Sequence, residues 1–235
     1  MLRSDIADPH ISLLRAARKP AARFAALVIA GVSLLIIGLQ ASETWRGREL
    51  RLREAEIATA NMAHALSAQG ETAIRVTDTV LASVVTQVER EGWSGPPGER
   101  LGKYLRDVVA EAREVNGVLV YDADGNWVVN SLDHAMQGNN ADREYFRFHK
   151  ANPQRGAHVG LPVLSRSTGV WVLPVSRRIN RPDGSFAGVV VATIRIAYFA
   201  KLYEGFDIGA KGTIVLARDD GALAYRRPFD ETLIG

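Results

Sequence analysis

The stretch that decides the fold reads VWVLPVSRRIN at 170–180, RPDG at 181–184 and SFAGVVVATIRI at 185–196. The two outer segments are rich in valine and isoleucine, which favour strands, and the Pro-Asp-Gly sequence between them is typical of a turn. Two such segments around a short polar turn predict an antiparallel β-hairpin.

A second hairpin is predicted upstream of the first. GVLVYD at 117–122 and WVVNS at 127–131 flank a turn, ADGN, that carries Asp124 and Gly125. Between the two hairpins, REYFRFHK at 143–150 has the pattern of a short helix, and Asp142 is in position to cap its N-terminus. The order strand pair, helix, strand pair indicates an antiparallel sheet with a helix against it.

Helical patterns precede the sheet. Residues 43–90 contain no proline and repeat apolar residues at threes and fours, which predicts a long amphipathic stalk helix with a possible break near Gly70. Residues 92–100 form a loop, and residues 101–115 predict a second amphipathic helix. Helices followed by an antiparallel sheet place the chain in the α+β class.

Residues 24–42 form an uncharged apolar run of nineteen residues. A helix of this length reaches about 28 Å, close to the thickness of the membrane hydrocarbon. Basic residues crowd the 1–23 tail, whereas the charges after the run nearly cancel, so the positive-inside rule predicts a transmembrane helix with a cytoplasmic N-terminus. A cleavable signal peptide and a buried helix of a soluble protein are the alternatives.

Composition excludes several classes of function. The tail holds five basic and two acidic residues, and the rest of the chain has 24 of each, so the net charge of +3 indicates no nucleic-acid surface. The chain has no cysteine, and its five histidines lack the close spacing of metal ligands. Without a nucleophile elbow or a phosphate loop, we expect no enzymatic activity and no cofactor.

The last segment, 201–235, opens another strand pair in TIVLARDDGALAYRR. Asp220 and Gly221 stand there as Asp124 and Gly125 stand in the first predicted hairpin. This similarity predicts the start of a second copy of the sheet, which we expect to be incomplete at Gly235.

The string from Asp142 to Ile194 resembles the extracytoplasmic double-Cache (PAS-like) sensor domain of bacterial membrane-bound diguanylate cyclases, histidine kinases and chemoreceptors. The resemblance covers roughly 45–235. It implies a membrane-distal PAS-like subdomain at 91–200, which usually carries the ligand pocket, and a second subdomain that is truncated here. It also implies an output domain outside this chain.

One branch of that family recognises amino acids through an arginine, two aromatic residues and a small residue at fixed spacing. Arg143, Tyr145 and Phe146 match the start of this motif, but His149 replaces the small residue. The acidic residue that holds the ligand's ammonium group in that branch is replaced by Thr193. The resemblance therefore implies pocket roles for Arg143 and Tyr145 without implying an amino-acid ligand.

Six residues are the candidate ligand contacts. Arg143 at a helix start suits an anion, although it could instead pair with a neighbouring acid or with a loop carbonyl. The others are aromatic or polar side chains that would face one another across the sheet, for which packing in the core is the alternative. They are Tyr121, Tyr145, His149, Trp171 and Ser176. Ser176 and Arg178 alternate with Val175 and Arg177, and the sequence leaves open which pair faces the core.

Together these features predict the periplasmic ligand-sensing portion of a bacterial inner-membrane signalling protein. We expect a small anionic or zwitterionic periplasmic ligand, contact with the lipid bilayer, and a homodimer formed along the stalk helix. A membrane-anchored periplasmic module that binds a protein and no small molecule is the alternative.

Overall fold

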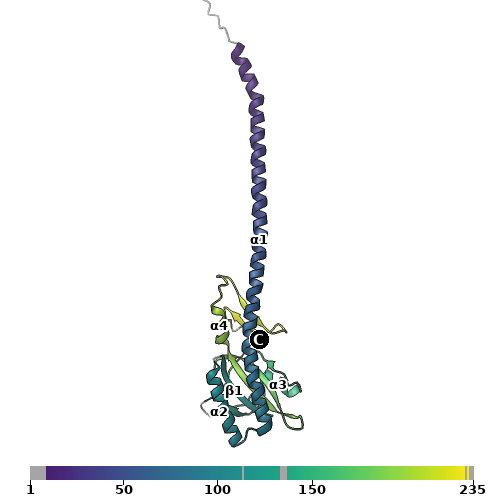
Figure 1. Ribbon diagram of the computed structural model, residues 1–235, viewed down its shortest axis with the longest axis vertical. Coiled ribbons are helices and arrows are strands. Elements are labelled where there is room, and N and C mark those ends of the chain that lie inside the picture. Colours follow the sequence, from purple (N-terminus) through teal and green to yellow (C-terminus); the bar gives the residue numbers. More distant parts are fainter. Residues whose placement is uncertain (1–8, 113, 133–136, 231, 233–235) are drawn as a thin grey trace, which may run out of the picture. The chain divides into compact units, whose positions relative to one another are not determined.

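The computed structural model describes residues 9–112, 114–132, 137–230 and 232, with side chains from residue 23 onward. The chain divides into two units, residues 1–63 and residues 64–235. Helix α1 (Pro9–Glu91) continues from the first unit into the second (Figure 1).

The first unit, where it is described, consists of α1 alone. Its apolar side chains from Phe24 to Leu39 are exposed, and by length and composition this helix is able to cross a membrane. The predicted transmembrane and stalk helices are therefore parts of one helix. The predicted break near Gly70 is wrong, since α1 runs through this residue without interruption.

The second unit is built on a six-stranded antiparallel sheet. Its strand order is β2-β1-β6-β5-β3, and β4 also pairs with β5. The strands are β1 (Val115–Asp122), β2 (Trp127–Asn130), β3 (His158–Val159), β4 (Val163–Leu164), β5 (Trp171–Asn180) and β6 (Phe186–Arg195). The β1–β2 and β5–β6 pairs confirm both predicted hairpins.

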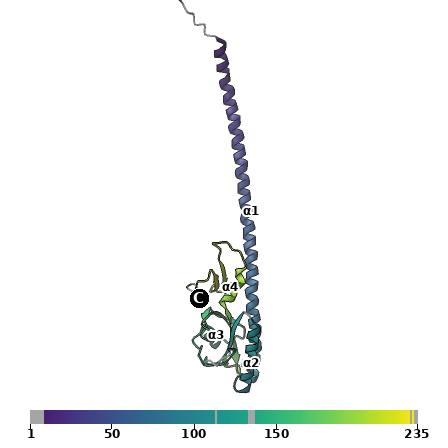
Figure 2. The ribbon, with the colours of Figure 1, turned by 90° about the vertical axis from the view of Figure 1, so that its left-hand side faces the viewer.

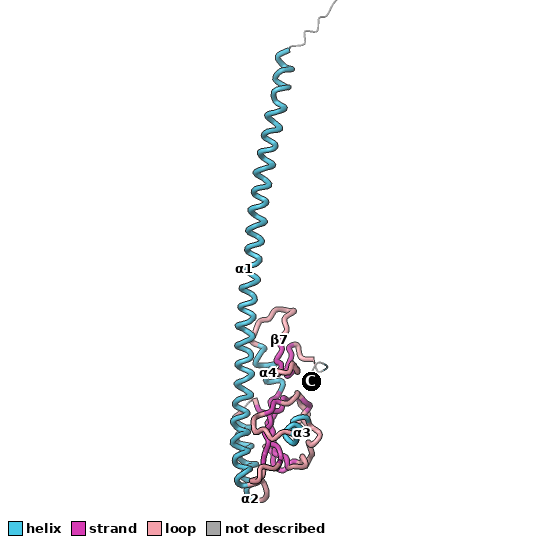
Figure 3. Tube along the Cα trace, turned by 90° about the vertical axis from the view of Figure 1, so that its right-hand side faces the viewer, coloured by secondary structure: helices cyan, strands magenta, loops and turns pink. Residues whose placement is uncertain are grey.

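Helices cover both faces of this sheet. Figures 2 and 3 show the C-terminal part of α1 and helix α2 (Pro96–Glu111) on one face, and α3 (Glu144–Ala151) on the other. On the α1 face, Arg177 of β5 binds the Asp78 carboxylate through two nitrogens, at 2.5 and 2.9 Å. The central strands β1 and β6 are buried along almost their whole length, which accounts for their continuous apolar sequences.

The chain leaves the sheet through α4 (Ile196–Glu204), which spans the predicted subdomain boundary at 200. Strands β7 (Ile214–Ala217) and β8 (Leu223–Arg227) then form a separate antiparallel pair. Phe199, Tyr203 and Tyr225 pack their rings together between α4 and β8. Residues 231 and 233–235 of the predicted second subdomain lie outside the described part.

Candidate functional site

A small cavity of about 20 Å³ lies between the sheet and the N-terminal end of α3. It is lined from β1, β2, β4, β5 and β6, from the start of α3 and the loop before it, and from the turn that follows β4. The lining residues are Leu119, Tyr121, Trp127, Asn140, Arg143, Tyr145, Val163, Ser165, Arg166, Ser167, Val172 and Thr193. The lining therefore combines apolar walls with several hydrogen-bond donors, as small-ligand sites do.

Two buried tyrosines and an asparagine form the floor of this cavity. Asn140 donates from Nδ2 to the hydroxyl oxygens of Tyr121 and Tyr145, at 2.9 and 2.7 Å, and the two rings stack with centroids 6.3 Å apart. Burial raises the pKa of Tyr121 well above its ordinary value and also raises the pKa of Tyr145. Both phenols therefore stay neutral and keep a proton to donate.

Arg143 enters the cavity from the position just before α3. Its backbone is extended and forms the N-cap of the helix, so the prediction that Asp142 caps this helix is wrong. The Arg143 Nη2 donates to the carbonyl oxygen of Leu164 at 2.9 Å. The guanidinium thus binds a main-chain carbonyl, in strand β4 and not in a loop as the sequence had left open, while it also lines the cavity.

Asp142 is held by Arg166 instead. Both carboxylate oxygens of Asp142 accept from Arg166 nitrogens at 2.7 Å. Arg166 also donates to the Asn139 carbonyl at 2.8 Å and to Asn140 Oδ1 at 3.2 Å. The hydrogen bonds from Arg166 lower the pKa of Asp142 to about 2, so this ion pair is fully charged at neutral pH.

Trp127 joins the cavity because of a β-bulge. The β1–β2 register pairs Val120 with Val129 and then Tyr121 with Trp127, so one residue of β2 is skipped. The skipped residue turns Trp127 onto the same sheet face as Tyr121. Its indole Nε1 is buried and has no hydrogen-bond partner among the described residues. A buried indole donor usually finds a partner, which makes Trp127 a candidate contact for a ligand oxygen.

The six predicted contacts divide into two groups. Arg143, Tyr145 and Tyr121 are brought together around the cavity, whereas His149, Ser176 and Trp171 are not among its lining residues. Ser176 shares the sheet face of the cavity, together with Arg178, but lies farther along β5.

His149 lies one helical turn after Tyr145, where its Nε2 is 3.0 Å from the Ser176 hydroxyl. Its side chain is fully buried, and burial lowers its pKa to about 4. Trp171 occupies an odd position of β5, on the face opposite the cavity. Strand alternation therefore separates it from the lining residue Val172.

Sequence reasoning missed several lining residues, among them Trp127, Asn140 and Arg166. Period-two alternation places Trp127 on the face of Val129, and only the bulge reverses this. Asn140 and Arg166 belong to polar loops that carry no periodic signal. The one available signal was chemical, since Arg166 is a basic residue between two serines in a turn that follows a short apolar stretch.

Comparison with known proteins identifies the domain. The Cache domain family matches residues 49–235, most of the chain. The extracellular domain of rpHK1S-Z16, a protein described as a histidine kinase, is 35% identical, with a TM-score of 0.65 over 74% of this chain and 69% of that one. The chain belongs to the Cache domain family. Cache domains of histidine kinases and chemoreceptors are extracellular ligand-sensing modules, which confirms the predicted sensory class.

More distant Cache domains share the fold alone. The ligand-binding domain of the Pseudomonas fluorescens chemoreceptor CtaA, solved with L-isoleucine, is 14% identical, with a TM-score of 0.58 over 74% of this chain and 68% of its own. That of Pseudomonas aeruginosa PctC, solved with GABA, is also 14% identical, with a TM-score of 0.55 over 70% of this chain and 72% of its own. A search of curated proteins finds no match.

The cavity of this Cache domain is suited to negative charge. Two guanidinium groups, from Arg143 and Arg166, line it, and no acidic side chain is among its lining residues. Thr193 of β6 donates its hydroxyl to the Gly117 carbonyl at 3.3 Å, where the resemblance implied an acid in amino-acid receptors. The arrangement can bind and orient a carboxylate through charge-assisted hydrogen bonds.

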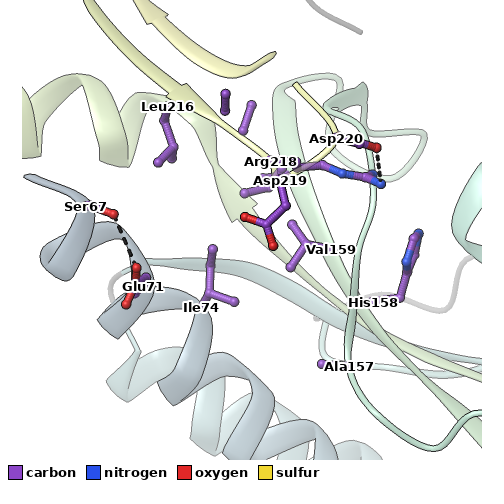
Figure 4. A pocket seen from close by; sticks show the side chains of 13 residues that line it. Ser67, Glu71, Ile74, Ala157, His158, Val159, Leu216, Arg218, Asp219 and Asp220 are labelled. Atoms are coloured by element: carbon purple, nitrogen blue, oxygen red, sulfur yellow. Dashed lines mark hydrogen bonds and ion pairs between the residues drawn. The ribbon is translucent and has the colours of Figure 1, made fainter. Parts of the chain in front are cut away.

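A larger pocket, of about 470 Å³, lies between α1, β3 and the β7–β8 pair (Figure 4). Its charged groups are mostly acidic: Glu71 accepts from Ser67 at 3.2 Å, and Asp220 pairs with Arg218 at 2.9 Å beside Asp219. This surplus of carboxylates disfavours an anion. The smaller cavity is therefore the better candidate for an anionic ligand.

Proposed function

We propose that this Cache domain binds a small carboxylate-bearing ligand, anionic or zwitterionic, in the cavity lined by Arg143, Tyr121 and Tyr145. The observation that carries the proposal is the convergence of two arginines and two neutral phenols on a cavity whose lining residues include no acid. Carboxylates are the common biological anions that such a donor set holds in two-point geometry.

The proposal includes a place in the cell. The chain is a membrane protein with a sensor outside the cytoplasm, and we place its N-terminus in the cytoplasm because basic residues crowd the tail before residue 24. A histidine kinase is favoured as the output over a diguanylate cyclase, because the 35%-identical relative is described as a kinase. The chain itself then senses and does not catalyse.

Signalling in this proposal is a shift between two populations. A ligand that binds one arrangement of the sheet and α3 more tightly favours that arrangement, and the difference reaches the membrane through α1. We also propose a homodimer along α1, which is supported by exposed apolar residues in the stalk region, namely Leu50, Leu52 and Ile57.

The test is a thermal-shift screen of the full chain in detergent against acetate, propionate, lactate, succinate, L-valine and GABA. We expect at least one carboxylate to raise the melting temperature, because binding to the native state alone stabilises it. The variant Arg143→Gln should lose this shift, since it removes the guanidinium and keeps an uncharged polar side chain.

The matched control is Arg147→Gln, which removes an exposed arginine one turn farther along α3, outside the cavity. This variant should keep the wild-type shift. If no carboxylate shifts a well-folded protein, or if both arginine variants respond alike, the cavity is not a carboxylate site. The alternative function, a domain that binds a protein partner, would then be favoured.

A further inference from the structure

The carboxylate of Asp142 is paired with a second arginine, Arg166, beside the cavity. Its two carboxylate oxygens accept from Arg166 in the two-point geometry that a carboxylic-acid ligand would use. The two side chains are 55% and 40% exposed, respectively. Ion pairs with this exposure contribute little net stability, so another carboxylate can replace Asp142 at small cost.

Two arginines tie the same segments together from opposite sides. Arg143, at the start of α3, donates to the carbonyl of Leu164 in β4, and Arg166, in the turn after β4, donates back to Asn139 and Asp142. Within this closed arrangement the cavity volume is about 20 Å³. A single water needs roughly 10–15 Å³ on this scale, so an organic carboxylate fits only if the turn moves.

The turn after β4 has few side-chain contacts with the sheet. Ser165 to Gly169 form a tight turn in which Gly169 has a positive φ of 69° and its amide donates to the Ser165 carbonyl. Besides Arg166, the side-chain anchor of this turn to the sheet is Thr168, 3.1 Å from Asn116 Nδ2. Displacement of Asp142 would therefore remove two of the four hydrogen bonds by which Arg166 holds the turn to residues 139–142.

We infer that Arg166 is a second ligand-binding arginine and that Asp142 is its internal competitor. Asp142 holds Arg166, and with it the turn, until the carboxylate of a ligand takes its place. Asp142 then turns toward solvent, where its side chain is already half exposed. This inference rests on the proposed function, because it concerns the same cavity and the same class of ligand.

Two variants of the one ion pair test the inference. Propionate is the probe, titrated into the full chain in detergent by calorimetry at constant ionic strength. Asp142→Asn removes the competing charge and leaves Arg166 free, so the Kd for propionate should fall several-fold. Arg166→Gln removes the ligand contact, so the Kd should rise about tenfold or more.

Opposite directions are the signature of competition. An ion pair with a purely structural role would be lost in both variants, and both would then change the Kd in the same direction. Asp142→Ser, which removes the carboxylate and leaves no amide, should tighten binding as Asp142→Asn does. Thermal unfolding of each variant near the wild-type temperature checks that the fold is kept.

Asp220→Asn is the control for net charge, because it removes one exposed acid from another Arg-Asp pair, with Arg218, away from the cavity. It should leave the Kd unchanged. If the wild type binds propionate and Asp142→Asn does not bind it more tightly, the inference is overturned and the proposed function stands. If neither propionate nor any other carboxylate of the screen binds the wild type, the proposed function itself fails.

Discussion

Replacing Gly188 with alanine is expected to lower the free energy of unfolding by about 3 kcal/mol. Gly188 pairs with Asp122 of β1 on one side and with Ile179 of β5 on the other, within the central strand of the sheet. A Cβ atom there would lie 2.0 Å from the carbonyl oxygen of Tyr121 and 3.1 Å from its carbon. Because these are backbone atoms, β1 and β6 would have to separate.

Urea unfolding of the full chain, followed by circular dichroism, measures this loss. The matched control is Gly156→Ala, because a Cβ on this exposed glycine would meet nothing within 4 Å. We expect the control to stay within about 0.5 kcal/mol of the wild type. Equal stability of the two variants would show that β1 and β6 are not packed as described. Since Tyr121 lines the cavity, Gly188→Ala should weaken ligand binding as well.

Acidification is expected to destabilise the native state through His149. Burial, together with the nearby charges of His158 and Arg178, lowers the pKa of this histidine to about 4, against the hydrogen bond with Ser176 and the charge of Glu144. In the unfolded chain the pKa returns to about 6.5. Between these two values the unfolded state binds a proton that the native state does not.

The buried, neutral His149 therefore makes its full contribution to the free energy of unfolding above pH 6.5. This contribution is lost as the pH falls toward 4. The loss attributable to this one residue is roughly 3 kcal/mol, from 1.36 kcal/mol for each unit of pKa difference. Urea unfolding at a series of pH values measures it. His149→Gln should flatten the pH dependence in this range relative to the wild type.

His64→Gln, which replaces an exposed histidine of α1, is the matched control and should keep the wild-type pH dependence. A wild-type slope that persists in His149→Gln would assign the acid sensitivity to other groups. Because His149 lies on the same short helix as Tyr145, its protonation would also disturb the cavity at its floor.

The two hairpins and helices α1 and α3 were predictable because their residues follow regular periods. Strands β3 and β4, of two residues each, were not predicted, and α2 begins at Pro96, inside the predicted loop at 92–100. The valine-rich segments around the turn at 181–184 predicted the β5–β6 pair. Apolar residues spaced three and four positions apart predicted the helix that continues from the membrane span. The break predicted near Gly70 was wrong because a glycine destabilises a helix by only about 1 kcal/mol, which a packed helix tolerates.

The cavity was only partly predictable, for physical reasons. Arg143, Tyr145 and Tyr121 follow from a motif and from strand position. The place of Trp127 in the cavity depends on the residue of β2 that is skipped in the pairing with β1. This bulge moves the Trp127 side chain to the other face of the sheet without changing the composition of the strand. Arg166 meets Asp142 across 24 positions through a loop, and no local pattern encodes that contact.

The most direct test of the central claim is a crystal structure of the protein grown with propionate. We predict the carboxylate within hydrogen-bond distance of Arg143 and Arg166, with Asp142 displaced and the Trp127 indole donating to the ligand. Propionate bound instead in the acidic pocket between α1 and the β7–β8 pair, or a cavity still closed by the Asp142–Arg166 ion pair in crystals saturated with propionate, would contradict the account.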